Sequence, residues 1–237
     1  MTERGRAAVT RDATQRVLGP SALEWIGGTL RLHLDEVSAP LPFRIRGTID
    51  VETGPHTSQR RTLDAQARHR WGVIASCARI AIDLDAPKLA WSGSAYLDTI
   101  RGDVPLERNF MRWNWSRAHL ADGRTAVVYD LQRRHGGPLS IADRFDADGG
   151  SGTFEAPLIA KLPATHWGLR ASTRLEASVA STVEQSFEDG PSYSRSVVST
   201  NWLGQPVTGV HEHLSLERFE RRWVRALLPF RMPRQIF

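Results

Sequence analysis

The chain has 237 residues, of which 41% are hydrophobic and 24% are charged, a balance that is typical of a folded globular protein. Its formal net charge is +5, but acidic residues are interleaved with the basic ones and no nucleic-acid-binding motif is present, so we expect no nucleic acid partner. No apolar run reaches the ~18 residues that a membrane-spanning helix needs, and the single cysteine, Cys77, excludes an internal disulfide.

The first predicted elements are strands, because apolar and polar side chains alternate. Leu30, Leu32 and Leu34 share one face, and the polar residues between them share the other, which is the pattern of a half-buried strand. The same alternation predicts strands at 43–51, 80–84, 125–133, 139–145, 174–187, 194–203 and 206–216. Near the C-terminus, residues 216–228 carry an apolar stripe with helical spacing, which Pro229 would end.

Glycine-containing turns separate these strands, among them Gly27-Gly28, Asp122-Gly123, Gly136-Gly137-Pro138 and Asp148-Gly149-Gly150. Many short strands joined by such turns predict an all-β barrel or sandwich with one short C-terminal helix. The segment Asp85-Ala86-Pro87-Lys88 can connect one sheet to the next. We therefore expect two domains, 1–85 and 86–237, of which the second has the usual size of a small β-barrel and the first is short.

Two pairs of side chains have the spacing that places both on one face of a strand. Tyr96 and Asp98 would bring a phenol ring beside a carboxyl group, and His69 and Trp71 form a second such pair before the strand that follows. Such pairs also occur where a tyrosine borders a core and the aspartate is solvated. The string Arg68-His69-Arg70 by itself favours a solvated loop.

Several longer stretches are similar to the carotenoid 1,2-hydratase (hydroxyneurosporene synthase) family, and together they extend from about residue 10 to residue 234. They include Trp91-Ser92-Gly93-Ser94-Ala95-Tyr96-Leu97-Asp98, Trp113-Asn114-Trp115-Ser116-Arg117-Ala118, Asp122-Gly123-Arg124-Thr125-Ala126-Val127-Val128-Tyr129-Asp130, Gly209-Val210-His211-Glu212 and Leu228-Pro229-Phe230-Arg231-Met232-Pro233-Arg234.

The resemblance implies a fold of two lipocalin-like β domains. Family members carry a further stretch before the part that matches Met1, so we expect the first domain here to be incomplete. The implied activity is acid-catalysed addition of water to the terminal C1=C2 double bond of an acyclic carotenoid of the lycopene or neurosporene type. Water is then the second substrate, and no cofactor is expected.

The family's His-x-Trp and Tyr-x-Asp elements match His69, Trp71, Tyr96 and Asp98, including the separation between the two elements. The resemblance implies that Asp98 is the general acid and that Tyr96 and Trp71 stabilise a carbocation. His69 would position or deprotonate the water, or hold Asp98 in orientation.

A second group of residues would hold the substrate or support the site. Trp91, Trp113 and Trp115 are candidates for substrate binding, and Glu107 and Glu212 for supporting carboxylates or for structural ion pairs with arginine. The chain departs from the family where Ser94-Ala95 replaces His-Gly and where Ile100 replaces a nearby Asn, which puts substrate preference in doubt.

Other readings remain open. Residues His211 and His213 have the spacing of two metal ligands on one strand face, but His213 replaces a family serine and no third ligand is evident, so we expect no metal. The chain could instead be a lipocalin-like carrier that binds carotenoids or other isoprenoids without chemistry. It could also be a related cyclase that protonates an isoprenoid and closes a ring.

The C-terminal segment combines apolar residues such as Phe219, Trp223 and Phe230 with many arginines, which suits peripheral contact with an anionic membrane. A terminal helix that packs on the barrel with its arginines outward would have the same pattern. The first residues lack the apolar core of a secretory signal, so we expect a cytoplasmic protein on the inner membrane. The sequence does not indicate how many subunits assemble.

Overall fold

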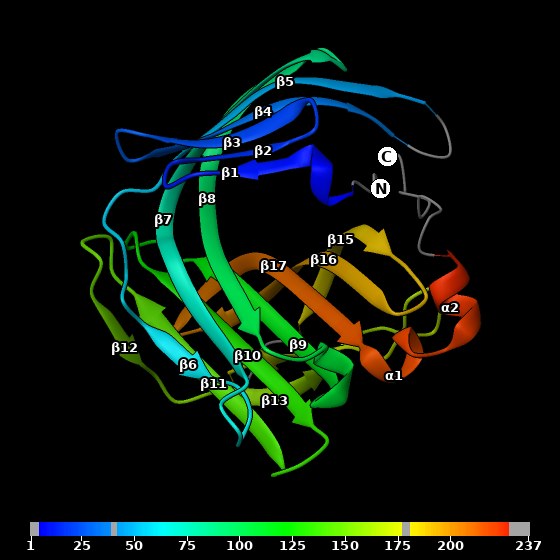
Figure 1. Ribbon diagram of the computed structural model, residues 1–237. Coiled ribbons are helices and arrows are strands. Elements are labelled where there is room, and N and C mark those ends of the chain that lie inside the picture. The colour runs from blue at the N-terminus through cyan, green and yellow to red at the C-terminus, as the bar shows by residue number, and fades with distance from the viewer. Residues whose placement is uncertain (1–4, 39–41, 177–180, 228–237) are drawn as a thin grey trace.

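The computed structural model describes residues 5–38, 42–176 and 181–227, and these form an antiparallel β protein (Figure 1). An eight-stranded sheet comprises most of the N-terminal part, a seven-stranded sheet follows, and a separate hairpin of two strands packs on the second sheet. The all-β fold class is therefore confirmed.

The eight-stranded sheet has the order β1-β2-β3-β4-β5-β7-β6, and β8 pairs with β7. A short 3-10 helix, η1 (Arg6–Ala8), precedes it. Its strands are β1 (Val9–Arg11), β2 (Gln15–Leu18), β3 (Ser21–Ile26), β4 (Thr29–Val37), β5 (Arg44–Glu52), β6 (Arg60–Thr62), β7 (His69–Ala86) and β8 (Leu89–Gly102).

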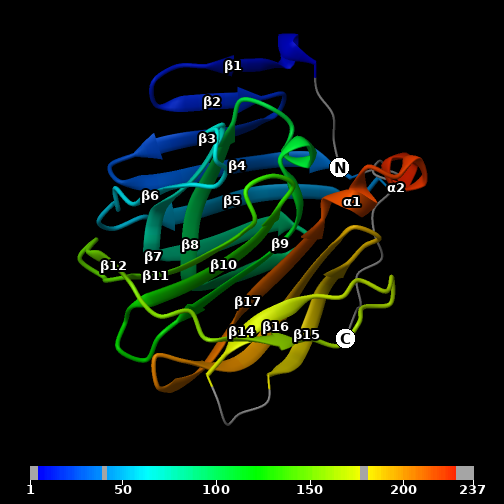
Figure 2. The same cartoon turned by 90° about the horizontal axis from the view of Figure 1, so that it is seen from below.

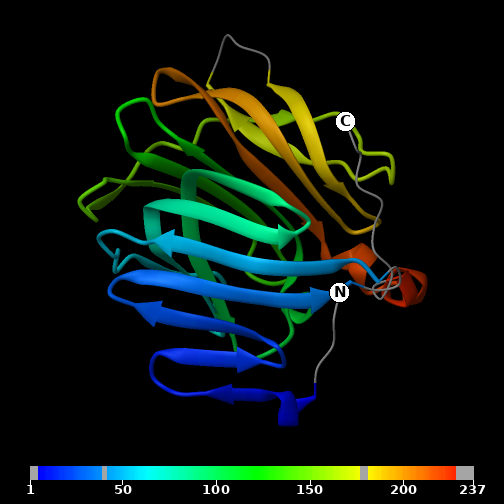
Figure 3. The same ribbon diagram turned by 90° about the horizontal axis from the view of Figure 1, so that it is seen from above.

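The seven-stranded sheet has the order β12-β11-β10-β9-β17-β16-β15, and β13 pairs with β14 outside it. Helix η2 (Leu106–Arg108) leads into this sheet. The strands are β9 (Phe110–His119), β10 (Thr125–Arg133), β11 (Pro138–Phe145), β12 (Ser151–Thr153), β13 (Leu158–Lys161), β14 (Ser172–Leu175), β15 (Thr182–Asp189), β16 (Tyr193–Trp202) and β17 (Gln205–Ser215). Figures 2 and 3, which view the molecule from opposite sides, place β1 and β15 at opposite edges.

The long hairpin of β7 and β8, here called the β7–β8 ribbon, links the two sheets. Its upper half pairs with β5 through residues 79–86, and its lower half lies across one face of the seven-stranded sheet (Figure 1). The register of the ribbon shifts between Val73 and Ala75 and again between Ala75 and Ala78. Such bulges bend and twist a strand, which allows one ribbon to belong to both arrangements.

The main hydrophobic core fills the space between the lower ribbon and the seven-stranded sheet. Trp71 and Val73 from β7 pack there against Val127 and Tyr129 from β10, and all four side chains are buried. A second cluster, which includes Trp202 and Val207, covers the opposite face of the same sheet. The upper part of the eight-stranded sheet instead pairs charges such as Arg31 and Asp50 on one face.

The single strand predicted at 174–187 is wrong, because β14 and β15 belong to different sheets. Alternation of apolar and polar residues occurs in any half-buried strand, so it does not mark the point where the chain passes from one sheet to another. The predicted helix at 216–228 is two short helices, α1 (Leu216–Phe219) and α2 (Arg222–Leu227), and its last residue and Pro229 lie outside the described residues. The predicted boundary at residue 85 falls beside the turn of the β7–β8 ribbon, and the division into two domains stays a prediction.

No helix among the described residues is long and apolar enough to cross a membrane.

Candidate active site

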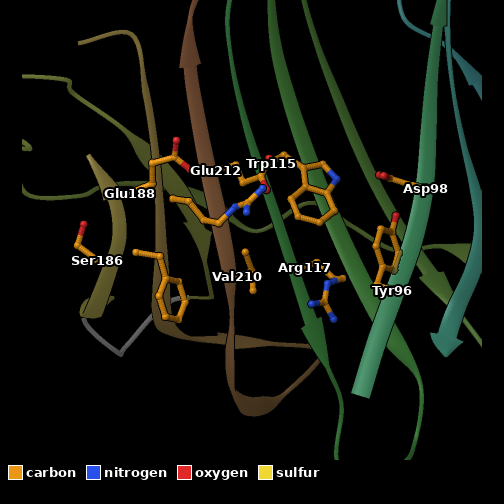
Figure 4. A pocket seen from close by; sticks show the side chains of 10 residues that line it. Tyr96, Asp98, Trp115, Arg117, Ser186, Glu188, Val210 and Glu212 are labelled. Atoms are coloured by element: carbon orange, nitrogen blue, oxygen red, sulfur yellow. The ribbon is translucent and has the colours of Figure 1, made fainter. Parts of the chain in front are cut away.

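A pocket of about 630 Å³ lies between β8 and the face of the seven-stranded sheet that the ribbon covers. Figure 4 shows Tyr96 and Asp98 projecting from β8 toward Trp115 and Arg117 of β9, with Glu212 of β17 on the far side. The lining residues are Tyr96, Asp98, Trp115, Arg117, Ser186, Phe187, Glu188, Arg195, Val210 and Glu212. The pair predicted from the Tyr-x-Asp spacing therefore shares one pocket.

The Asp98 carboxyl group is held from the core side. The indole N–H of Trp71 donates a hydrogen bond of 2.7 Å to Oδ2 of Asp98, and Trp71 itself is buried in the main core. Because Oδ2 is the acceptor of this bond, Oδ1 is available to carry a proton. A carboxylic acid in this position can present that proton to a molecule in the pocket.

Burial raises the pKa of Asp98, and the negative charge of Glu212 raises it further. The Trp71 N–H and the positive charge of Arg117 act in the opposite direction, but the net result is a pKa above the ordinary value. The physical cause is that a low-dielectric surrounding disfavours the charged carboxylate. Asp98 thus has the environment of a general acid.

Aromatic groups surround the same point. The rings of Tyr96 and Trp115 have centroids 5.6 Å apart, and the guanidinium carbon of Arg117 lies 5.2 Å from the centroid of the Tyr96 ring. Burial and the nearby Asp98 charge raise the pKa of Tyr96 well above its usual value, so the phenol stays neutral. The Tyr96 hydroxyl and the Trp115 N–H are both buried without a hydrogen-bond partner, which leaves them able to bind water or substrate.

The far wall of the pocket holds an ion pair. Arg195 contacts one oxygen of Glu212, Oε1, through Nε at 2.9 Å and through a terminal nitrogen at 2.8 Å. These residues lie directly opposite each other on β16 and β17. The sequence indicates Glu212 only as a supporting carboxylate or an ion-pair partner. The other candidate of this kind, Glu107, pairs with Arg225 outside this pocket at 3.2 Å.

His69 does not line the pocket, so of its predicted roles the geometry suits only that of holding Asp98 in orientation, through Trp71. The His69 side chain is fully buried at the start of β7, Nδ1 lies 2.6 Å from a carboxylate oxygen of Asp64, and Nε2 lies 2.9 Å from the carbonyl oxygen of Val104. The side-chain amide nitrogen of Asn109 lies 3.3 Å from Nδ1 as well, so groups of the protein engage both ring nitrogens. Neither nitrogen is directed at the pocket, and the contacts instead fix the strand that carries Trp71.

Asp64 completes this arrangement. Although burial raises its pKa, hydrogen bonds from the backbone of Arg68 and from the ring and backbone of His69 bring the pKa below the usual range. Asp64 is therefore a carboxylate that faces the imidazole. Nothing in the sequence periodicity pairs Asp64 with His69, because the connection between them is a turn.

The three predicted substrate-binding tryptophans separate in the structure. Trp115 lines the pocket, whereas Trp113 belongs to the main core beside Tyr129, with ring centroids 6.0 Å apart. Trp91 lies on the upper half of β8 opposite Ile82, is 48% exposed, and does not line the pocket. Of the three, only Trp115 has the geometry for direct contact with a molecule in this pocket.

The two histidines of β17 lie on the other face of the seven-stranded sheet. His211 Nδ1 is 2.8 Å from the Ser116 hydroxyl, and His213 Nδ1 is 2.8 Å from the side-chain oxygen of Asn114. Among the described residues, no group of three or more histidine, cysteine, aspartate or glutamate side chains could hold a metal ion.

Sequence reasoning missed Arg117 and Arg195 as members of the site. Arg117 has the same strand parity as Trp115 and could have been proposed from that spacing. Arg195 reaches the pocket only because β16 pairs with β17 in one particular register, which the alternation within a single strand does not contain.

Residues 1–236 match the family model described as carotenoid hydratase CrtC. The acyclic carotenoid 1,2-hydratase of Rubrivivax gelatinosus is 46% identical over 99% of this chain and 58% of that protein, and the one from Thiocapsa roseopersicina is 43% identical over the same shares. The hydratase of Cereibacter sphaeroides is 34% identical, over 99% of this chain and 84% of its own length.

The chain thus spans somewhat more than half the length of the first two relatives. A solved structure described as an AttH protein from Nitrosomonas europaea matches with a TM-score of 0.57 and 15% identity, over 88% of this chain and 72% of that one. That likeness concerns the fold alone. With a family model that covers nearly every residue, the chain belongs to the carotenoid hydratase family.

Proposed function

We propose that this protein adds water to the terminal C1=C2 double bond of an acyclic carotenoid, without a cofactor. The observation that carries the proposal is Asp98, a carboxyl group with a raised pKa that is fixed by Trp71 and faces an aromatic pocket. The relatives named acyclic carotenoid 1,2-hydratase support the choice of substrate. The reaction class is hydro-lyase chemistry.

The first step is transfer of a proton from Oδ1 of Asp98 to C2 of the alkene. The electron pair of the double bond forms the new C–H bond, and C1 becomes a tertiary carbocation. An isolated alkene is a weak base, so the donor must be a carboxylic acid that burial keeps protonated.

Two features of the pocket stabilise the cation. The carboxylate left on Asp98 is the counter-ion, and the rings of Tyr96 and Trp115 present electron-rich faces near it. A desolvated cation over an aromatic face gains ~2 kcal/mol. Water then bonds to C1, and loss of one proton gives the tertiary alcohol.

A carotenoid is about as long as the hydrocarbon layer of a bilayer is thick, ~30 Å. A pocket of about 630 Å³ therefore suits the end of the molecule, where the C1=C2 bond lies, while the rest of the polyene extends outside.

The direct test is expression in a bacterial host that makes lycopene, with the pigments then separated by polarity. A more polar pigment that contains oxygen from labelled solvent water supports hydration. A cyclic product without solvent oxygen would identify a cyclase. Pigment that is bound but unchanged by both the natural protein and Asp98→Asn would identify a carrier.

The substrate's insolubility calls for contact with a membrane, and α2 supplies a candidate surface. Trp223 is 50% exposed and stacks on Trp167, with ring centroids 6.0 Å apart. Arg221 and Arg222 beside it are exposed as well, and exposed tryptophan next to arginine suits an anionic interface. The protein would then be peripheral on the cytoplasmic face of the inner membrane.

Part of the segment predicted to bind lipid, including Phe230, Arg231 and Arg234, lies outside the described residues. Val224 of α2 is buried, so the helix also packs on the protein, as the alternative interpretation expects. Flotation with anionic and with neutral vesicles, comparing the natural protein with Trp167→Ser/Trp223→Ser, tests the contact. Equal flotation of the two proteins with anionic vesicles would remove α2 from the proposal.

A further inference from the structure

Glu212 occupies a position in the pocket for which the mechanism so far has no use. It lies on β17 with Trp115 of β9 directly opposite on one side and Arg195 of β16 on the other. Asp98 projects toward the pocket from β8, on the opposing wall (Figure 4). The carboxyl groups of Asp98 and Glu212 therefore face one pocket from different elements.

The ion pair with Arg195 fixes the Glu212 carboxylate in the wall of the pocket. The printed contacts of the guanidinium go to Oε1, and the Tyr193 hydroxyl also hydrogen-bonds to Glu212. A carboxylate oxygen held in this way can accept a hydrogen bond from a water molecule and can receive its proton.

The other groups around the pocket are less suited to this task. His69 has both nitrogens engaged by Asp64 and Val104 outside the pocket, and an arginine does not give up its proton. The charged and titratable side chains that face Glu212 and Asp98 are Tyr96 from β8, Arg117 from β9, Tyr129 from β10, Glu188 from β15, and Tyr193 and Arg195 from β16. Glu188 lines the same wall, but no ion pair fixes it among the described residues.

We propose that Glu212 holds the attacking water and accepts its proton, opposite the acid Asp98. This rests on the proposed hydration. Once Asp98 has protonated C2, the water oxygen forms a bond to C1 while one O–H bond breaks and its proton passes to the carboxylate of Glu212. Glu212 is then neutral and Asp98 is a carboxylate. A proton passes from Glu212 through pocket water to Asp98, which restores both groups, so that the net change is alkene plus water to alcohol.

The arrangement has a second effect on the acid. The negative charge of Glu212 is one of the causes that raise the pKa of Asp98. Neutralising Glu212 would therefore lower that pKa and move the alkaline limit of activity to lower pH. Shortening the side chain while keeping its charge would leave that limit in place.

The experiment compares the purified natural protein with Glu212→Gln and Glu212→Asp in deuterated water, with lycopene in detergent micelles. A cation that water does not capture loses a proton and returns as an alkene that carries deuterium at C2. This alkene is either the starting polyene or its isomer with a terminal methylene group. The ratio of deuterated alkene to alcohol thus measures how well water is positioned after protonation.

We expect Glu212→Gln to lower hydration about 100-fold, to raise the ratio of deuterated alkene to alcohol at least tenfold, and to move the alkaline limit to lower pH. Glu212→Asp should raise the ratio without moving the limit. Glu184→Gln, an exposed residue of β15 outside the pocket, is the matched control and should behave as the natural protein does.

The result that overturns the inference is a Glu212→Gln protein that hydrates with the natural ratio and the natural alkaline limit. If this variant does not fold, as circular dichroism would report, Glu212→Asp decides through the ratio alone. If the natural protein itself forms no alcohol, the proposed hydration fails and the role of Glu212 fails with it, which is distinct from a Glu212→Gln protein that hydrates like the natural one.

Discussion

The two faces of the seven-stranded sheet differ in how their polar residues are hydrogen-bonded, and strand β17 contributes residues to both faces. Glu212 faces the pocket, while its neighbours His211 and His213 face the β13–β14 hairpin. On that hairpin side, Ser116 lies 3.2 Å from Thr173, and Asn114 donates to Ser172 at 3.1 Å. On the pocket side, the Tyr96 hydroxyl and the Trp115 N–H have no partner.

The difference shows how a sheet can combine rigidity with reactivity. Hydrogen bonds within the protein consume the polar groups of the hairpin face, apart from Nε2 of His211, and thereby fix the hairpin. The pocket face keeps polar groups uncommitted and holds a carboxyl group whose charge the surroundings disfavour. Mutations on the two faces should therefore affect different measurements.

The largest effect is expected for Asp98→Asn on the pocket face. Loss of the proposed general acid should lower turnover about 10³- to 10⁴-fold. Stability should stay the same or rise near pH 7, because an amide has no charge that burial disfavours. Turnover assays and urea unfolding check the two parts. A loss of activity that follows only from loss of folded protein would contradict the assignment.

On the hairpin face, Arg174→Ala should act on stability. Arg174 of β14 makes two hydrogen bonds to the Asp130 carboxylate, and both side chains are largely buried. Removing it leaves a poorly solvated charge, which should lower the free energy of unfolding by about 3 kcal/mol. Turnover per folded molecule should stay near natural.

The exposed ion pair of Arg124 and Asp122 is the matched control for this change. Arg124→Ala should change the free energy of unfolding by less than about 1 kcal/mol. Equal losses of unfolding free energy from Arg124→Ala and Arg174→Ala would show that burial of the Arg174–Asp130 pair does not increase its contribution to stability.

The hairpin face should also weaken in acid. Burial lowers the pKa of His211 to about 3 and that of His213 to about 4, from an ordinary value of 6.5. The unfolded chain then binds more protons than the folded protein, so stability is full above pH 6.5 and is lost as pH falls toward 4. In His213→Ser, the decrease in unfolding free energy from pH 7 to pH 5 should shrink by about 1–2 kcal/mol. An unchanged decrease would exclude His213 as a cause.

The smallest expected effect is that of Trp71→Phe, which keeps a ring in the core and removes the N–H donor to Asp98. That donor lowers the pKa of Asp98, so its loss should raise the pKa and extend activity to higher pH, opposite to the change expected for Glu212→Gln. Turnover should fall about tenfold because Oδ2 is no longer fixed. A pH profile of turnover records both changes. A shift to lower pH would contradict this reading of the hydrogen bond.

Alternation within single strands predicted β4, β5, β10, β11, β16, β17 and part of β7, but not β8 or β9, whose side chains form much of the pocket. The strand expected at 125–133 has the bounds of β10, and those expected at 194–203 and 206–216 differ from β16 and β17 by one residue at each end. The Tyr96 and Asp98 pair was predictable for the same reason, because residues two apart share a face.

The rest of the site depends on pairing between strands and on turns. The Glu212–Arg195 contact comes from the register of β16 on β17, and the partner of His69 is supplied by the turn that contains Asp64. Neither contact produces a periodic pattern of residues in the sequence, so neither could be predicted from it. The bulges between Val73 and Ala78, which bend the ribbon over the sheet, are likewise absent from a simple alternation.

The bend of the β7–β8 ribbon also determines where Asp98 lies relative to the opposing wall of the pocket. Asp98 is opposite Val73, next to the first register shift of the ribbon, and it lies on a continuous strand whose other end belongs to the eight-stranded sheet. The span between proton donor and opposing wall is thus set by backbone curvature and not by a loop. Ala75 lies between the two register shifts and does not line the pocket. A larger side chain at this position would change the bend of the ribbon and thereby the distance between Asp98 and the opposing wall of the pocket.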